Sequence, residues 1–175
     1  MSSSLTIDTD RPWSITGWAK CNGVCNPKGD STMQFIFGTA HSSILTYIGF
    51  YKEGGLIFGS GSRSGPGGYA YDLFAPSTWF YFAVSADPVA STTTTYVNDW
   101  TPRSFVANGA GRSKNVMFGT RNHNHTHRIG LNTFDGWIDE FSYWDIALSP
   151  SEVAELYRNG VRESHHYKAR FNPHT

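Results

Sequence analysis

Four acidic side chains lie close together near the end of the chain, so acid–base catalysis is the first chemistry to consider. The run "FDGWIDEFSYWD", residues 134–145, contains Asp135, Asp139, Glu140 and Asp145. A glycosidase needs two carboxylates facing one sugar, one as general acid and the other as nucleophile or base. If this run is a strand, Asp139 and Glu140 point to opposite faces, whereas Asp139 and Asp145 share a face about 20 Å apart. The pattern therefore predicts that the protein is not an enzyme.

The other residue types give no stronger catalytic arrangement. Two acids that serve one bond from a single strand need an acid-x-acid spacing, and the chain has this spacing only at Asp8 and Asp10. No serine stands in a G-x-S-x-G turn, and neither cysteine has a histidine nearby in the sequence. We therefore expect no nucleophilic hydrolase either.

Three histidines alternate in "RNHNHTHRIG", and alternating imidazoles are a candidate metal site. In an extended chain His123, His125 and His127 project from one face, each about 6.7 Å from the next. One zinc ion can take only two neighbours from such a run and needs further ligands from elsewhere. The alternative is a hydrogen-bonding loop or strand end, and the sequence favours this alternative.

A calcium site is the other metal candidate, because calcium prefers oxygen ligands such as those of Asp and Asn. Asp87, Asn98, Asp99 and Asp135 lie near predicted strand ends, where their side chains could converge. Their spacing forms no ligand loop, and turn formation accounts for the same residue types. We therefore expect no required cofactor and keep calcium as a candidate.

Strands must position these residues, because apolar runs alternate with Gly, Pro, Asn, Asp and Ser clusters along the chain. Strands are predicted at 12–20, 33–38, 43–51, 55–60, 68–74, 78–86, 92–98, 115–120 and 134–145. The run 78–86 is apolar on both faces, which is typical of a central strand. The pattern predicts an all-β fold, a jelly-roll β-sandwich of two antiparallel sheets in one domain over 1–175, with 161–175 as a C-terminal tail or added strand.

One short helix is predicted near the C-terminus, directly after the last strand. Ser149 stands at the N-cap position, Pro150 at the first helical position, and Glu152 where it can complete a capping box. Asn159-Gly160 is a stop signal. Three apolar side chains recur at helical spacing: Val153, Leu156 and Tyr157. We therefore expect a helix over 150–159 that packs this apolar stripe against a sheet.

Composition limits the classes of partner. The chain of 175 residues carries 14 basic and 14 acidic residues, a formal net charge of zero. Nucleic acids and anionic membranes attract proteins with a basic field, so neither is an expected partner. The densest apolar run, 79–84, is far too short to cross a bilayer. We therefore expect no membrane insertion.

The two cysteines, Cys21 and Cys25, leave the redox compartment open. In an extended chain their Cα atoms would lie about 13 Å apart, which is too far for a disulfide. Asn22-Gly23 is a turn signal that could bring them closer. A zinc site would need a second pair of ligands nearby. Two reduced cysteines are the expectation, and a local disulfide is the alternative.

No secretory signal is visible at the N-terminus, because Met1 precedes a polar stretch without a basic region or an apolar core. If the protein starts here, we expect synthesis without a secretion signal, as for a subunit of a virion or another surface assembly. If the sequence is part of a longer protein, an extracellular location is equally compatible.

The order of the motifs resembles a known family. The chain contains "WSITGWAK", "STWFYFAVSAD", "TTYVND", "NVMFGT" and "FDGWIDEFSYWDIALSPSEVAELYRNG" in that order. This order resembles the laminin-G-like branch of the concanavalin A-like lectin/glucanase superfamily over residues 12–160. The resemblance implies a jelly roll whose final strand lies beside the N-terminal strand, followed by a short helix. It also implies a non-catalytic role in binding glycans or proteins.

The chain departs from that family at its beginning. Members usually carry an opening strand before the position of Trp13, and here that strand is short or missing. An unpaired edge beside the final strand is a liability unless another segment covers it. The segment 164–175 is one candidate, because Tyr167, Ala169 and Phe171 alternate like a half-buried strand. A second subunit is the other candidate, which would make the protein a homo-oligomer or part of a larger assembly.

Three functions remain in consideration. A glycan-binding module would expose Trp100, Tyr69 or Tyr71 on a concave face or rim, because aromatic rings stack on the apolar faces of sugars. An accessory or decoration subunit of an assembly such as a virion would bind a protein surface instead. A carbohydrate-binding or catalytic domain of a polysaccharide-degrading enzyme is the third. We expect a non-catalytic binding or assembly module.

Overall fold

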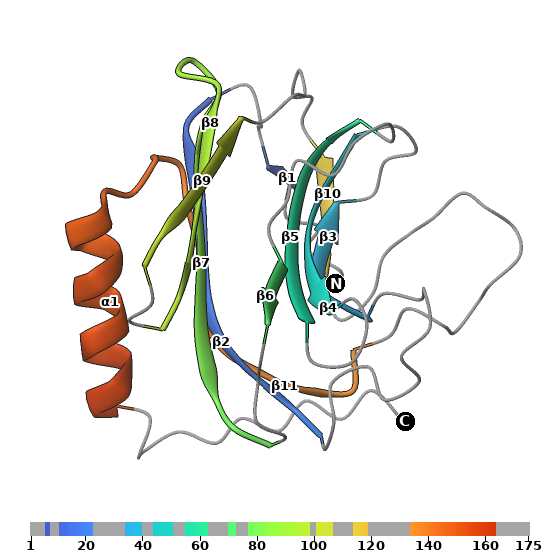
Figure 1. Cartoon of the computed structure of the whole chain (residues 1–175), viewed down its shortest axis with the longest axis vertical. Coiled ribbons are helices and arrows are strands. Elements are labelled where there is room, and N and C mark those ends of the chain that lie inside the picture. The colour runs from blue at the N-terminus through green and yellow to red at the C-terminus, as the bar shows by residue number, and fades with distance from the viewer. Residues whose placement is uncertain are drawn as a thin grey trace, which may run out of the picture.

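The computed structural model describes residues 6–7, 11–22, 34–39, 44–50, 55–62, 70–72, 77–98, 101–106, 114–118 and 134–163. Within these ranges the chain forms two antiparallel sheets that pack face to face, with one helix on the outside of the sandwich (Figure 1). The predicted all-β jelly-roll sandwich with a helix near the C-terminus is confirmed. No helix in these ranges is both long and apolar enough to cross a membrane.

The first sheet has six strands in the spatial order β1-β10-β3-β4-β5-β6. Their bounds are β1 Thr6–Ile7, β3 Gln34–Thr39, β4 Ile44–Phe50, β5 Gly55–Ser62, β6 Ala70–Asp72 and β10 Lys114–Phe118. The opening strand, expected to be short or missing, is the two-residue β1. It pairs with β10 at the end of this sheet and not with the final strand.

The second sheet has five strands in the spatial order β11-β2-β7-β8-β9. Their bounds are β2 Trp13–Cys21, β7 Phe80–Asp87, β8 Thr92–Val97, β9 Arg103–Val106 and β11 Gly136–Trp144. The final strand β11 pairs antiparallel with β2, as the family resemblance implied. It is the end strand of this sheet within the described ranges, and the segment 164–175 that was expected to cover it lies outside them.

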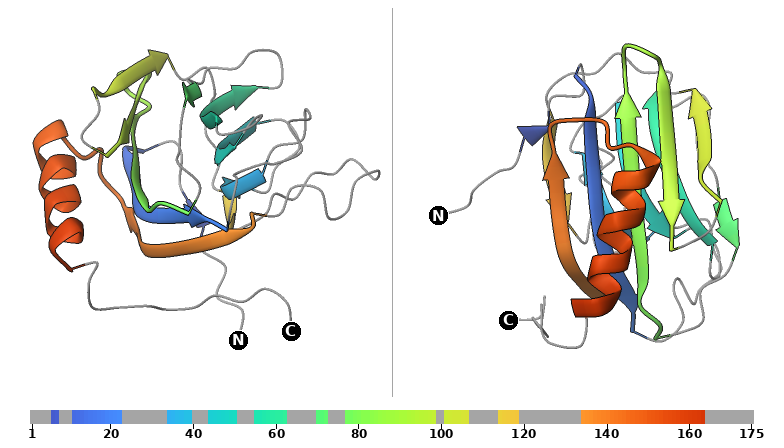
Figure 2. Two further views of the ribbon diagram at one scale, coloured as in Figure 1. Left: turned by 60° about the horizontal axis from the view of Figure 1, so that its bottom comes forward. Right: turned by 90° about the vertical axis from the view of Figure 1, so that its left-hand side faces the viewer.

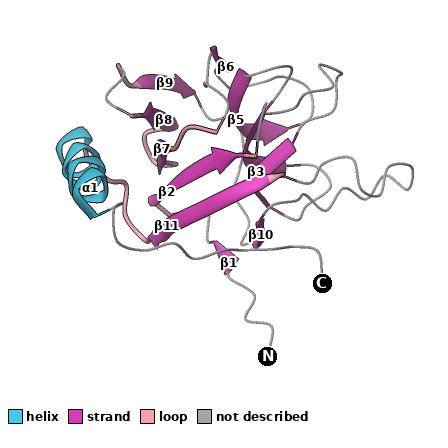
Figure 3. Ribbon diagram, turned by 90° about the horizontal axis from the view of Figure 1, so that it is seen from below, coloured by secondary structure: helices cyan, strands magenta, loops and turns pink. Residues whose placement is uncertain are grey.

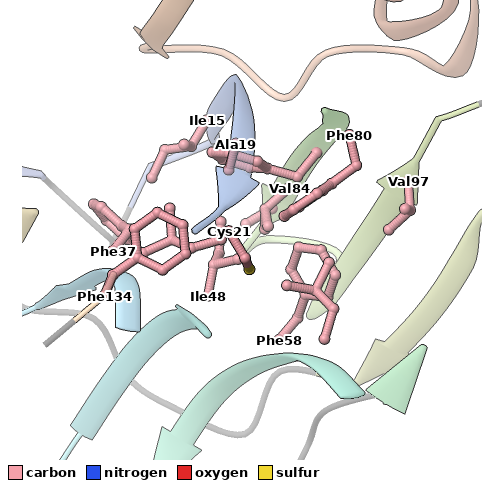
Figure 4. Close-up of a cluster of buried hydrophobic side chains, with 14 of the residues drawn as sticks. Ile15, Ala19, Cys21, Phe37, Ile48, Phe58, Phe80, Val84, Val97 and Phe134 are labelled. Atoms are coloured by element: carbon pink, nitrogen blue, oxygen red, sulfur yellow. The ribbon is translucent and has the colours of Figure 1, made fainter. Parts of the chain in front are cut away.

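The space between the sheets is filled by apolar side chains that alternate along the strands (Figure 4). On β2, Ile15 and Ala19 point into this core, and on β7, Phe80 and Val84 do the same. The six-stranded sheet contributes several of the largest fully buried side chains: Phe37, Phe58, Ile36, Ile48 and Leu56. Alternate side chains of β2 and β7 therefore point into the core, as the period-two geometry of a strand requires.

The other face of the five-stranded sheet is covered by the helix α1, Pro150–Glu163 (Figure 2). Val153 is buried there, and Leu156 and Tyr157 pack against the same cluster, so the predicted apolar stripe is confirmed. On the sheet side the cluster contains Trp18, Tyr81, Ala83, Tyr96 and Leu148. Because β7 has the core on one face and the helix on the other, it is the central strand that its apolar sequence predicted.

The start of α1 is the predicted capping box. Ser149 N donates to Glu152 Oε2 at 2.7 Å, and Glu152 N donates to Ser149 Oγ at 3.4 Å. The Ser149 hydroxyl also donates to Glu152 Oε2 at 2.6 Å. The predicted end at Asn159-Gly160 is wrong, because the helix continues to Glu163. Residues 161–163, which were predicted as part of the C-terminal tail, therefore belong to the helix.

The connector between β11 and α1 is fixed to the sheet by two buried serines. Ser14 Oγ donates to Ile146 O at 2.8 Å and accepts Leu148 N at 2.9 Å. Ser85 Oγ donates to Leu148 O at 2.8 Å. These bonds satisfy the backbone groups of a connector that leaves the sheet, and they place Leu148 in the cluster under the helix.

Replacing Leu148 by Ala is expected to reduce the free energy of unfolding by about 2–4 kcal/mol, because this side chain is only 6% exposed. Ile146, two residues earlier and 49% exposed, is the matched control, and Ile146→Ala should change stability by less than about 0.5 kcal/mol. Urea unfolding followed by circular dichroism measures both. Equal losses of unfolding free energy in the two variants would show that Leu148 is not buried under α1.

The capping box also predicts an acid-dependent contribution to stability. The Ser149 hydroxyl, followed by the Ser149 backbone N–H, lowers the pKa of Glu152 below its ordinary value of 4.5. A lowered folded-state pKa means that the stabilisation is present above pH 4.5 and is lost as the pH falls through the folded-state pKa. Glu152→Gln keeps the capping geometry without the charge. Its stability deficit, measured by unfolding from pH 7 into the acid range, should therefore shrink on acidification, and a pH-independent deficit would contradict this.

Candidate functional site

The outer face of the five-stranded sheet carries a lysine and a tryptophan that contact each other. Lys20 and Trp137 are directly opposite in the pairing of β2 with β11. The Lys20 ammonium lies over the Trp137 ring, 5.3 Å from its centroid, which is a cation–π contact. Both residues lie on the face opposite the core, since Ala19 and Cys21 on either side of Lys20 point into the core. Both are half-buried and so remain accessible.

A second tryptophan continues this arrangement on the neighbouring strand. Trp79 immediately precedes β7 and is 39% exposed. Because Ala19 is opposite Phe80, the continuation of that register places Trp79 beside Lys20. We refer to these three residues as the Trp137–Lys20–Trp79 row. Lys20 thus contacts the Trp137 ring, and the backbone of Trp79 continues toward the other side of Lys20 directly before β7.

The helix covers the part of the face next to this row. Trp18, two residues before Lys20, stacks on Tyr157 of α1 with ring centroids 5.7 Å apart. Lys20, Trp137 and Trp79 do not belong to the cluster under the helix. Seen from below, β2 and β11 extend away from α1 (Figure 3). The row therefore lies at the border between the covered and the accessible part of the outer face.

Asp139 and Glu140 lie next to the row, at an irregularity in β11. The pairing of β11 with β2 shifts between Asp139 and Ser142, and Glu140 has a positive φ of 48°. Asp139 is opposite Trp18, and the Glu140 carboxylate approaches Gly160 of α1. Both side chains are therefore on the outer side, and the expectation that they point to opposite faces is wrong. The physical reason is the bulge, which interrupts the alternation of side chains.

The two carboxylates have different surroundings. Asp139 Oδ1 accepts the Glu140 backbone N–H at 2.8 Å. Glu140 Oε2 lies 2.9 Å from the position that a Cβ on Gly160 would take. The Asp139 carboxylate is thus bonded to backbone, and the Glu140 carboxylate lies beside the end of α1. A pair that works on one sugar needs both groups to face the same bond.

The end of α1 is seated on Trp18. A Cβ added to Gly160 would meet Trp18 Nε1 at 2.5 Å, so only glycine permits this approach. Tyr81 lies in the same cluster as Trp18 under α1. Burial, followed by the negative charge of Glu140, raises the pKa of Tyr81 above its ordinary value of 10.0. Among the described residues the Tyr81 hydroxyl and Trp18 Nε1 have no hydrogen-bond partner. Since α1 seals both atoms from solvent, they belong to the packing and not to an accessible site.

The described members of the calcium candidate have turn roles. Asp87 Oδ1 accepts the N–H groups of Val89 and Ala90 at 3.0 and 3.1 Å, at the tip of the β7–β8 hairpin. Asn98 Oδ1 accepts Tyr81 N at 2.9 Å. Asp135 Oδ1 accepts Asn22 Nδ2 at 3.5 Å. Within the described ranges no three His, Cys, Asp or Glu side chains are grouped so that they could hold a metal ion.

Several predicted site residues lie outside the described ranges. They are Tyr69, Asp99, Trp100, His123, His125 and His127. Tyr71 belongs to β6, opposite Leu56, but its side chain is not described. The histidine site and the predicted aromatic contacts therefore stay predictions. The signal that sequence reasoning missed was the pairing of Trp137 with Lys20, which requires the register of two distant strands.

The expectation of two reduced cysteines is wrong. Cys21 is disulfide-bonded, and the only other cysteine of the chain is Cys25. The estimate for an extended chain does not apply, because β2 ends at Cys21 and the chain bends at Asn22. Asn22 N then donates to Asp135 O at 3.0 Å. The disulfide thus lies at the end of the strand that carries Lys20.

No family model matches the chain, and neither does any curated protein. Solved structures of low sequence identity share its fold. A heptameric SAP-like pentraxin from Limulus polyphemus has a TM-score of 0.64 at 16% identity, over 87% of this chain and 72% of the pentraxin. The receptor binding domain of botulinum neurotoxin type G has a TM-score of 0.62 at 17% identity, over 90% of this chain and 40% of that chain.

Mouse laminin α1 domains LG4-5 have a TM-score of 0.58 at 13% identity, over 85% of this chain and 40% of that chain. The NanB sialidase of Streptococcus pneumoniae is also similar, over 26% of its length. The chain thus spans less than half of the toxin, laminin and sialidase chains. These structures are concanavalin A-like jelly rolls, and this chain has the same fold.

Replacing Gly160 by Ala is expected to destabilise the protein by about 1–3 kcal/mol, because the new methyl group would overlap Trp18 and Glu140. This loss should occur although Ala is favoured over Gly inside a helix by about 1 kcal/mol. Asn159→Ala, at the exposed neighbouring position, is the control and should be neutral or slightly stabilising. Thermal and urea unfolding measure both variants. A Gly160→Ala protein more stable than the parent would show that α1 does not approach Trp18 this closely.

Proposed function

We propose that this protein is a non-catalytic recognition module that binds glycans through the accessible part of its outer sheet face. The observation that carries the proposal is the Trp137–Lys20–Trp79 row, in which the Lys20 ammonium lies over the Trp137 ring and the register continues to the exposed Trp79. Indole rings stack on the apolar faces of sugars, and polar neighbours form hydrogen bonds with the hydroxyl groups. The row combines both kinds of group on one surface.

The scaffold suits recognition. The row lies on β2, on β11 and directly before β7, and these strands pack on the core through their other face. Side chains on packed strands are held in place before a ligand arrives, which lowers the entropic cost of binding. Among the proteins that share the fold, the neurotoxin domain is a receptor binding domain. This likeness supports a binding role at the level of the fold.

Absence of catalysis is part of the proposal. Asp139 lies two residues after Trp137 on the outer side, and its Oδ1 accepts the Glu140 backbone N–H. No cofactor is required for the proposed binding. Calcium held by the candidate set of Asp87, Asn98, Asp99 and Asp135 would be compatible with it.

A second candidate function is that of an accessory or decoration subunit of a larger assembly such as a virion. The observation that favours it is that β9 and β11 are the end strands of the five-stranded sheet within the described ranges. An end strand can pair with a strand of another chain. Light scattering of the purified chain decides this point, since an assembly subunit should form a defined oligomer and a solitary lectin-like module should not.

A glycan array probed with the purified chain tests the proposed function. We expect binding to some of its glycans without release of sugar fragments, and we expect Trp137→Ala to weaken that binding about tenfold through loss of ring stacking. Val89→Ala, at the exposed tip of the β7–β8 hairpin, is the control and should bind like the parent. Loss of binding in Trp100→Ala alone would instead place the site at the predicted loop. Hydrolysis of a bound glycan would contradict the non-catalytic role.

A further inference from the structure

The accessible face has a distinctive balance of charge. Its described charged groups near the row are one cation, Lys20, and three carboxylates, Asp135, Asp139 and Glu140. A site for an anionic ligand needs an excess of positive charge or a cluster of donors. This face has neither among its described residues.

The same groups match the chemistry of a neutral sugar. A sugar hydroxyl can both donate and accept a hydrogen bond, whereas an ammonium group only donates and a carboxylate only accepts. Asp139 is half-buried, and its Oδ1 accepts the Glu140 backbone N–H. Asp139 follows Trp137 by two residues on the same face, about 6.7 Å away. A pyranose ring on Trp137 is therefore within reach of this carboxylate.

We infer that the Trp137–Lys20–Trp79 row and Asp139 form a subsite for neutral pyranose residues that discriminates against sialylated glycans. This inference rests on the proposed function and specifies its ligand class. One pyranose stacks on an indole ring of the row, Lys20 donates to a ring substituent, and Asp139 accepts a hydroxyl. A sialic acid carboxylate would lie close to Asp139 and would be repelled by it.

The row also defines the shape of the ligand. Adjacent strands lie about 4.8 Å apart, so the backbone of Trp137 on β11 and that of Trp79, directly before β7 on the other side of β2, are about 10 Å apart. That spacing is close to the length of two linked pyranose units. A linear oligosaccharide that crosses the strands would therefore contact both rings, with Lys20 between them. Longer neutral chains should bind more tightly than monosaccharides.

The indole N–H signals of the six tryptophans provide a direct test by NMR. The probes are cellohexaose, maltohexaose and mannohexaose as neutral sugars, and 3′-sialyllactose as the anionic one. We expect at least one neutral hexasaccharide to shift the indole signals of Trp137 and Trp79. Buried Trp13 and Trp18 serve as internal controls and should not shift. 3′-Sialyllactose at the same concentration should leave all of these signals unchanged.

Two conservative variants test the polar contacts. Lys20→Met keeps the length of the side chain without its charge, and Asp139→Asn keeps its shape without its charge. Each should weaken binding of the neutral hexasaccharide about tenfold, as expected for a hydrogen bond to a charged group. Both should unfold at the temperature of the parent, and Glu155→Gln on the exposed side of α1 is the matched control and should bind like the parent. Unchanged binding in both variants would overturn the inference.

The outcomes separate this inference from the proposed function. If 3′-sialyllactose shifts Trp137 and Trp79, or if a sugar shifts only the signal of Trp100, glycan binding holds and the neutral subsite is wrong. If none of these probes shifts any indole signal and the glycan array is also blank, both are wrong. If a protein partner shifts Trp137 and Trp79 while the sugars do not, the row is a protein-binding surface and the inference is wrong.

Discussion

The structure depends on one constraint: strands β2 and β7 are buried on both faces, so the sheet that contains them is covered on both sides. Phe82 and its neighbours on one face pack against the six-stranded sheet, while Tyr81 on the other face packs under α1. A sheet with two apolar faces is stable only as the middle layer of a fold. The connector that Ser14 and Ser85 fix to the sheet therefore matters as much as the helix itself, because it directs α1 back over the outer face.

Side chains on the outer face of β2 are either covered by α1 or accessible, depending on their position along the strand. Along the outer face of β2, Trp18 lies under the helix and Lys20 lies just beyond it, and the pairing with β11 sets Trp137 beside Lys20. The proposed recognition surface thus uses strands whose inner faces form the core. The bulge at Glu140 brings the Glu140 carboxylate to the outer side of the sheet, where it lies beside the end of α1. Recognition and packing share a scaffold, so the row has little freedom to rearrange.

Features set by residues close together in the sequence were predicted, whereas features set by contacts between distant residues were missed. Strong alternation predicted the long strands, and the capping box predicted the start of α1, since both are encoded within a few residues. Strand β9 was missed because it is short and polar and depends on pairing with β8, where Thr94 and Ser104 are bonded side chain to side chain. Gly160 was interpreted as a helix stop, whereas the structure places it inside the helix, where Trp18 leaves no room for a side chain.

The sequence by itself determined the fold class, the position of the helix after the final strand, and the absence of a net positive charge. These properties depend on composition, on period and on local capping chemistry. Only the tertiary structure decided which side chains meet. Lys20 and Trp137 are neighbours because β11 pairs with β2 in one register, and Asp139 and Glu140 share a side because a bulge interrupts that register. Registers between distant strands are set by how whole faces pack, and no local pattern specifies them.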